Sequence, residues 1–132
     1  MRPRGKLPHA ALLLLLLSTT SASGRVVPHP AGCPWRASCG CIASVRIFGK
    51  PVRFLYLAAN WFQFPRTYAR SGMVAVRRHH VMVIERMTGP HTAIVYDGNS
   101  GGHLTRIHER SLRGYVIVNP YAGDLSAKRR RK

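Results

Sequence analysis

Two short runs of apolar and β-branched residues stand in the middle of the chain on either side of a polar, turn-like segment, and this pattern predicts a β-hairpin. Residues 81–85 and 92–97 are rich in β-branched and apolar side chains, and each run has the length of a strand. They are separated by the sequence Met-Thr-Gly-Pro at residues 87–90, a combination typical of turns. The two runs are therefore predicted to pair as antiparallel neighbours.

The expected register of this hairpin brings polar side chains together at its open end. With a turn near Gly89, the numbers of paired residues add to about 178. His79 and His80 would then lie, within a residue or so, opposite three residues: Asp97, Gly98 and Asn99. An imidazole facing a carboxylate or an amide has its tautomer and orientation fixed, as a catalytic histidine requires.

A short amphipathic helix is predicted upstream of the hairpin. Ser38 is a suitable N-cap, and Gly49 ends the periodic segment. Between them an apolar stripe occurs at helical spacing, formed by Cys41, Val45 and Phe48. Cys39 would lie in the first turn.

The remaining pattern predicts a second helix and three more strands. Residues 55–64 place Leu57, Trp61 and Phe64 on one side of a helix. Strands are expected at residues 73–77, 104–108 and 115–118, after an extended lead-in at residues 25–37. Helices followed by strands indicate an α+β domain, in which a helix packs on an antiparallel sheet.

The strand at residues 81–84 is apolar on both faces, so we expect it to be covered on two sides. One cover would come from sheet or barrel closure. The other would be the helix that carries Cys39, which would bring the start of that helix towards His79 and His80.

The beginning of the chain has the three-part layout of a secretory signal. Basic residues at positions 2, 4 and 6 precede an apolar run at 10–17 and small polar residues at 18–24. Cleavage is expected near residues 22–24, and the apolar run is too short to span a bilayer. The protein is thus predicted to be secreted or periplasmic.

The charge of the chain is extreme, with 21 Lys and Arg residues against 4 Asp and Glu residues. Without the three basic residues of the leader, 18 basic residues remain and the net charge is near +14. In an exported protein such a field favours anionic lipid or cell-wall polymers as partners over specific nucleic acid. Residues 121–132 are expected to form a disordered basic tail.

Three cysteines, Cys33, Cys39 and Cys41, lie within nine residues. An odd number leaves one thiol over when a disulfide forms in an oxidising compartment. A bridge between Cys39 and Cys41 would be strained, so Cys33 is the expected partner of one of them. Either Cys39 or Cys41 can then be the free thiol.

A thiol at a helix N-terminus beside a histidine is an activated nucleophile, which attacks a carbonyl while the imidazolium later protonates the leaving amine. Four segments, in order, resemble the small exported CHAP-like members of the NlpC/P60 superfamily: residues 38–43 (SCGCIA), 59–61 (ANW), 72–81 (GMVAVRRHHV) and 98–100 (GNS). Members of that superfamily are papain-like cysteine amidases and endopeptidases of peptidoglycan.

The resemblance implies a CHAP-like domain over residues 38–120, with N-terminal helices packed on a small antiparallel sheet or partial barrel. It also implies a catalytic set of Cys39 as nucleophile, His80 as base and Asn99 as the group that orients His80, without a cofactor or metal. Two features depart from the family pattern: His79 replaces a glycine, and Cys41 with Ile42 replaces aromatic residues. They leave Cys41 as an alternative nucleophile.

Each site residue also has a structural interpretation. Cys39 can belong to a disulfide, His80 can be a structural histidine or give way to His79 as the base, and Asn99 can be a turn residue. No Cys-x-x-Cys or His-Glu-x-x-His motif supports a zinc site, and carboxylates are too few for glycoside hydrolysis. The alternative function is a non-catalytic module on the same fold that binds polyanions or cell-wall polymer.

Overall fold

The computed structural model of the protein describes residues 24–122. The predicted signal sequence, apart from its last residue, and nearly all of the predicted basic tail lie outside these residues. Among residues 24–122, the helices are all too short to cross a membrane.

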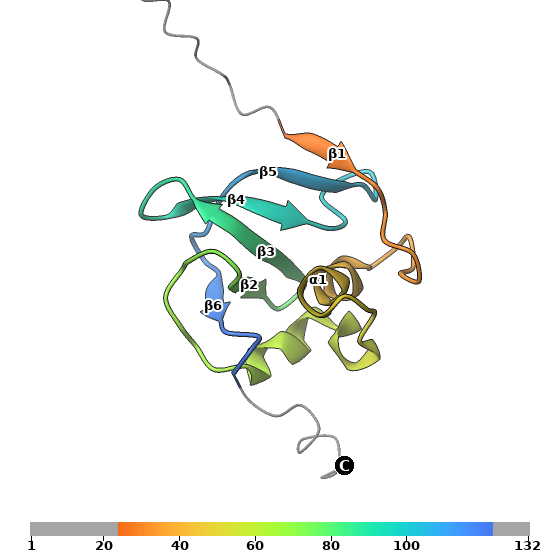
Figure 1. The fold of residues 1–132 in the computed structure, drawn as a ribbon, viewed down its shortest axis with the longest axis horizontal. Coiled ribbons are helices and arrows are strands. Elements are labelled where there is room, and N and C mark those ends of the chain that lie inside the picture. Colours follow the sequence, from red (N-terminus) through yellow and green to blue (C-terminus); the bar gives the residue numbers. More distant parts are fainter. Residues whose placement is uncertain (1–23, 123–132) are drawn as a thin grey trace, which may run out of the picture.

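The described chain forms an α+β domain built on one antiparallel sheet of six strands, which confirms the predicted fold class at this level (Figure 1). The spatial order of the strands is β1-β5-β4-β3-β2-β6. Their bounds are Arg25–Val27 for β1, Val74–Arg77 for β2, His80–Met87 for β3, Thr92–Asp97 for β4, Thr105–Ser111 for β5 and Val116–Val118 for β6.

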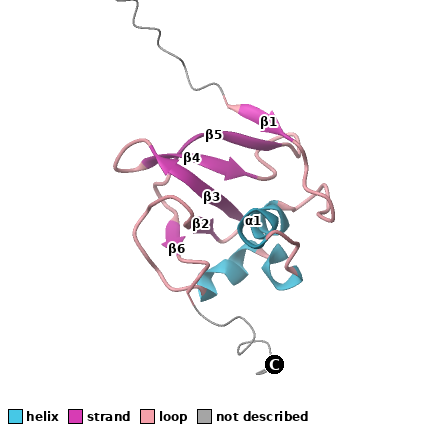
Figure 2. Ribbon diagram, viewed as in Figure 1, coloured by secondary structure: helices cyan, strands magenta, loops and turns pink. Residues whose placement is uncertain are grey.

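The helices gather on one side of the sheet, as Figure 2 shows in cyan. They are the α-helix α1 (Cys39–Phe48) and two 3-10 helices, η1 (Arg53–Tyr56) and η2 (Ala58–Gln63). α1 begins one residue after Ser38 and ends at Gly49, whose left-handed backbone donates a hydrogen bond to Val45 O. The predicted helix bounds are thus confirmed.

The predicted hairpin is formed by β3 and β4. Val83 lies opposite Tyr96 and Ile84 opposite Val95, so the paired numbers add to 179 near the open end. An irregularity between Ile84 and Arg86 then shifts the register by one residue towards the turn. The expected sum of about 178 is one less than the observed sum, and His80 and Asp97 meet at the open end as predicted.

β3 is buried on both faces, as its sequence predicts. Val81 and Val83 belong to the core that also contains Trp61 and α1 residues. Met82 and Ile84 belong to a second core on the other face of the sheet, together with Val95 and side chains from β2 and the β5–β6 connection. The helix that carries Cys39 therefore lies over the face of β3 formed by Val81 and Val83.

The prediction of a single helix at residues 55–64 is wrong. The segment forms η1 and η2, with an extended residue, Leu57, between them that is 60% exposed. Two carbonyls that a continuous helix would use accept side-chain bonds instead: Trp61 Nε1 donates to Leu55 O, and Asn60 Nδ2 donates to Phe54 O. Local side-chain bonds of this kind compete with regular helix formation.

The lead-in was predicted only as extended chain, yet it contributes β1. Arg25, Val26 and Val27 pair with β5 at the edge of the sheet. Three residues are too few for a hydrophobic alternation to stand out from the surrounding sequence. The strand is therefore defined by its partner β5 more than by its own residues.

Candidate active site

The cysteines divide into one disulfide and one free thiol. Cys33 and Cys41 are bonded, with a Cα–Cα distance of 5.7 Å, and Cys39 is free. This pairing decides between the two candidate nucleophiles, because a bonded Cys41 has no thiol to offer. It also confirms Cys33 as a bridge partner.

Cys39 is the first residue of α1 and is buried, with 6% of its surface exposed. Ser38 occupies the N-cap position as predicted, but its hydroxyl forms no capping bond and has no hydrogen-bond partner among the described residues. The side chain thus leaves the first helix amides uncapped beside the sulfur.

Gly40 allows this helix start to lie directly against η1. A Cβ atom at Gly40 would be 2.1 Å from Leu55 O and 2.5 Å from Tyr56 O. Only glycine permits backbone carbonyls to approach this closely. The position of Cys39 therefore depends on the absence of a side chain at the next residue.

His80 begins β3 directly after a two-residue turn. Arg77 of β2 pairs with His80, so Arg78 and His79 form the tip of the turn. The exposed His79 contributes only its backbone, whose carbonyl oxygen lies 4.0 Å from Cys39 Sγ. His80 is the histidine whose ring faces the site, and its side chain is 22% exposed.

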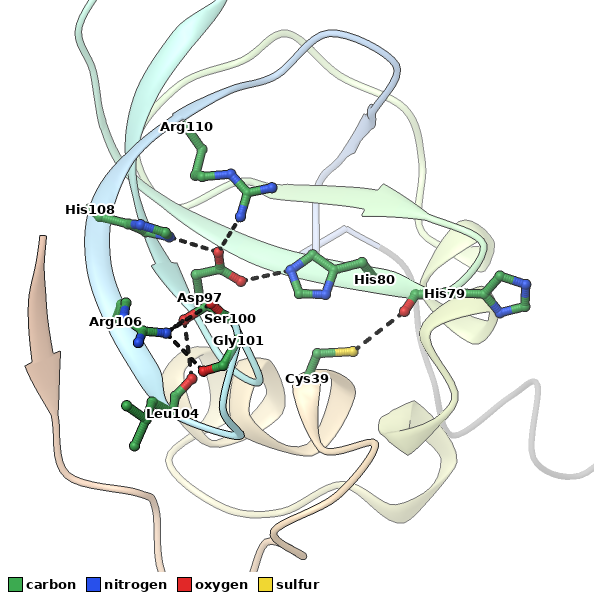
Figure 3. Close-up of polar contacts among 10 residues, drawn as sticks. All are labelled: Cys39, His79, His80, Asp97, Ser100, Gly101, Leu104, Arg106, His108 and Arg110. Carbon is green, nitrogen blue, oxygen red and sulfur yellow. Dashed lines mark hydrogen bonds and ion pairs between the residues drawn. The ribbon is translucent and has the colours of Figure 1, made fainter.

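The ring of His80 lies between the thiol and a carboxylate (Figure 3). His80 Nε2 is 2.6 Å from Asp97 Oδ1, so this nitrogen donates to the carboxylate. The hydrogen bond that the Cys39 thiol donates goes to the backbone oxygen of His79, the residue directly before His80. Because Nε2 is bound to Asp97, only the other ring nitrogen, Nδ1, can exchange a proton with the sulfur of Cys39.

Asp97 is fully buried and accepts three hydrogen bonds (Figure 3). Its Oδ1 faces His80, whereas its Oδ2 accepts from His108 Nε2 and from Arg110 Nη1, each at 2.8 Å. In the register of β4 and β5, His108 lies opposite Val95 and Arg110 opposite Ala93. Since side chains alternate along a strand, these residues share one face of the sheet with Asp97.

The structure differs from the sequence prediction at the third residue, because Asp97 and not Asn99 contacts His80. Continuing the register of β3 and β4 places Asn99 opposite His80, but β4 ends at Asp97. Asn99 has a φ of 55°, and its Oδ1 accepts a hydrogen bond from His103 Nδ1 at 3.1 Å. Because Asn99 lies beyond the end of β4, the ring of His80 binds Asp97, the last residue of that strand, and not the residue directly opposite.

The loop that follows Asp97 is fastened by an arginine from β5. Arg106 Nη1 donates to Ser100 O, Ser100 Oγ and Gly101 O at 2.8 to 3.0 Å (Figure 3). Gly98, which opens the loop, lies against Ile42 of α1, and a Cβ atom there would be 2.7 Å from that side chain. These contacts fix the chain direction immediately after the buried carboxylate.

Opposite effects act on the ionisation of His80 and Asp97. Burial disfavours the imidazolium of His80, but hydrogen bonds to Asp97 and Cys39 and the charges of both raise its pKa to about 9. Burial likewise raises the pKa of Asp97, but hydrogen bonds from His80 and His108 and the charges of His80 and Arg110 outweigh it, so the pKa is lowered. The site thus favours a protonated ring against an ionised carboxylate at neutral pH.

We expect this pairing to make stability depend on pH. The pKa of His80 is raised from 6.5 to about 9 on folding. Its stabilising contribution is therefore complete below pH 6.5 and is lost as the pH rises through about 9. Urea unfolding of the wild type and of His80→Gln should give a difference in unfolding free energy that shrinks from pH 6.5 to 9.5. A difference that stays constant over this interval would contradict the assignment.

His108 and Arg110 were not among the predicted site residues. A signal for them was present, because three basic side chains, Arg106, His108 and Arg110, occur at alternate positions in and directly after the strand predicted at residues 104–108. The strand in fact continues to Ser111. Three basic side chains on one face of a strand favour an acidic residue on the same face of the sheet. The chain has only four acidic residues, and Asp97 is the one that ends the neighbouring strand.

No protein-family model, curated protein or solved structure matches this chain. The site contains the three components of nucleophilic catalysis, placed one after another in space. The free thiol at the start of α1 can act as a nucleophile, the imidazole as a base, and the buried carboxylate as the group that orients the base.

Proposed function

We propose that the protein is an exported cysteine amidase or endopeptidase with a papain-like arrangement, which cleaves amide bonds in peptidoglycan peptides. The proposal depends chiefly on one observation: the free thiol of Cys39 lies at the backbone oxygen of His79, next to His80, whose ring is held by the buried Asp97. Its substrate class and export follow from the resemblance of residues 38–100 to the CHAP-like proteins and from the predicted signal sequence.

The reaction begins when the Cys39 thiol passes its proton to His80 Nδ1 and the sulfur attacks the carbonyl carbon of the amide, so that the carbonyl π-electrons move onto oxygen. The uncapped amides at the start of α1 are suited to bind that oxyanion. As the C–N bond breaks, His80 gives its proton to the departing amine and a thioester remains. His80 then takes a proton from water, which attacks the thioester, and the carboxylic acid product leaves with Cys39 regenerated.

Positive charge near the site supports an anionic substrate. Arg77 and Arg78 are exposed, immediately precede the histidine pair, and form no ion pair within residues 24–122. Arg77 is held in place, because it donates to Arg113 O at 2.6 Å and stacks on the ring of Tyr115. Arginine side chains of this kind bind carboxylates, which occur in cell-wall peptides.

Incubation of the purified protein with cell-wall fragments tests the proposal directly. We expect new amino and carboxyl groups to appear together, and mass spectrometry should assign the cut to an amide bond. Prior alkylation of Cys39 with iodoacetamide should abolish the reaction. Release of reducing sugar ends, or no release of amines by the folded protein with a free Cys39 thiol, would contradict the proposal.

The alternative, a non-catalytic module that binds polyanions, is favoured by the unpaired charge. Residues 24–122 include 13 Lys and Arg residues, and the ion pairs among them engage only Arg46 and Arg110. Such a module would bind wall polymer with an affinity that falls steeply with salt and is unaffected by alkylation of Cys39. Binding without release of amines would identify this function.

A further inference from the structure

We propose that His108 and Arg110 are positioning residues, which occupy Oδ2 of Asp97, hold the carboxylate in one orientation and reserve Oδ1 for His80. This inference rests on the proposed function for its catalytic meaning. The arrangement of the hydrogen bonds that carries it does not depend on which substrate is cleaved.

The first argument concerns rotation of the carboxylate. A carboxylate bound only through His80 could exchange its two oxygens by turning about the Cβ–Cγ bond. In the protein, that rotation would break the bonds that Oδ2 accepts from His108 and Arg110, each at 2.8 Å. Both donors come from β5, on the side of β4 opposite β3. Asp97 is thus held from one neighbouring strand while it binds the histidine of the other.

The second argument concerns charge. An ionised carboxylate that is fully buried requires compensation by hydrogen bonds or by opposite charge. When Cys39 is a thiolate and His80 an imidazolium, adding Asp97 and Arg110 gives two negative and two positive charges. Arg110 therefore makes the active form of the cluster neutral. His108 can donate its Nε2–H without adding a charge.

Other polar groups near Asp97 do not replace this function. Arg106 lies directly opposite Asp97 in the register, but its Nη1 is engaged by Ser100 and Gly101. Arg77, which pairs with His80, stacks on Tyr115 and donates to Arg113. The remaining charged or titratable groups beside the site, Arg78 and His79, lie exposed in the turn between β2 and β3.

Because Asp97 is an anion and Arg110 a cation, their removal should shift the pKa of His80 in opposite directions. Asp97→Asn removes the anion that stabilises the imidazolium, so the titration midpoint of the ring should fall by more than about 1 pH unit. Arg110→Met removes a competing cation and leaves the anion, so the midpoint should rise, by about 0.3 to 1 pH unit after allowance for screening. If the charge of Arg110 did not act on the pair formed by Asp97 and His80, this upward shift would be absent.

The experiment is NMR titration of the full-length, disulfide-bonded protein labelled with 13C-histidine, in which His80→Gln assigns the resonance. Arg86→Met is the matched control, because Arg86 is exposed on β3 and has no carboxylate partner within residues 24–122; the His80 midpoint should not move. Arg110→Lys, which keeps the charge, should lie close to wild type. A fall or no change in Arg110→Met would overturn the proposal.

His108→Ala provides a second test if Arg110→Met does not fold. Loss of one donor to Oδ2 should also raise the His80 midpoint, whereas His108→Gln, which retains an N–H donor, should restore it. An unchanged midpoint in His108→Ala would refute the role of His108. None of these readouts requires hydrolysis, so absence of activity on wall fragments would reject the proposed function and leave this inference to be judged by the titrations alone.

Discussion

Replacement of Cys39 by alanine should reduce the proposed hydrolysis of wall peptides by at least about 10⁴-fold, since the covalent pathway would lose its nucleophile. The fold should be retained, because alanine fills most of the small buried site at the start of α1. The rate is measured as release of amines from wall fragments, and folding by circular dichroism and urea unfolding.

The matched control removes the other two cysteines. A Cys33→Ser/Cys41→Ser variant loses the disulfide and should be less stable by about 2 to 3 kcal/mol, as expected for a short loop. Its folded fraction should still hydrolyse the substrate, because Cys39 and His80 remain. If this double variant were inactive while folded, or Cys39→Ala retained its rate, Cys39 would not be the nucleophile.

Gly40→Ala should lower the free energy of unfolding by about 3 kcal/mol or more. Helix propensity alone predicts the reverse, because alanine is favoured over glycine in a helix by about 1 kcal/mol. The steric effect dominates, since the new Cβ would overlap the carbonyl oxygens of Leu55 and Tyr56. Backbone atoms cannot move aside as the end of a flexible side chain can, so α1 and η1 must separate.

Urea unfolding measures this effect, and Gly49→Ala in the same helix is the control. Gly49 has a φ of 73° with no atom within 4 Å of a Cβ, so its replacement adds backbone strain but no collision. It should cost about 1 kcal/mol. Equal costs at the two positions would show that the contact between Gly40 and η1 does not govern stability.

The elements predicted best from the sequence are those in which the apolar pattern and the residues at the ends indicate the same structure. α1 has an apolar stripe, a glycine at its end and a serine at its start, and β3 and β4 are runs of apolar and β-branched residues joined by a turn. The prediction failed where a contact distant in sequence decides the conformation. Leu57 interrupts the second helix because Trp61 and Asn60 take the carbonyls of the preceding turn.

The site was partly predictable for the same reason. Cys39 and His80 belong to regular elements, so their positions follow from the pattern. Asp97 was within the predicted neighbourhood, but the choice between it and Asn99 depends on where β4 ends and the left-handed turn begins. The roles of His108 and Arg110 could not be predicted, because they depend on β5 lying beside β4 and no local sequence pattern shows which strands are neighbours.

The bridge between Cys33 and Cys41 encloses Cys39, so oxidation during folding can take three courses. Any pairing of two cysteines leaves a single thiol, yet only one pairing leaves the sulfur at the head of α1. A reagent that counts thiols would report the same value for all three isomers. Purified samples of equal thiol content could therefore differ in specific activity, and peptide mapping of the bridge is the measurement that would distinguish them.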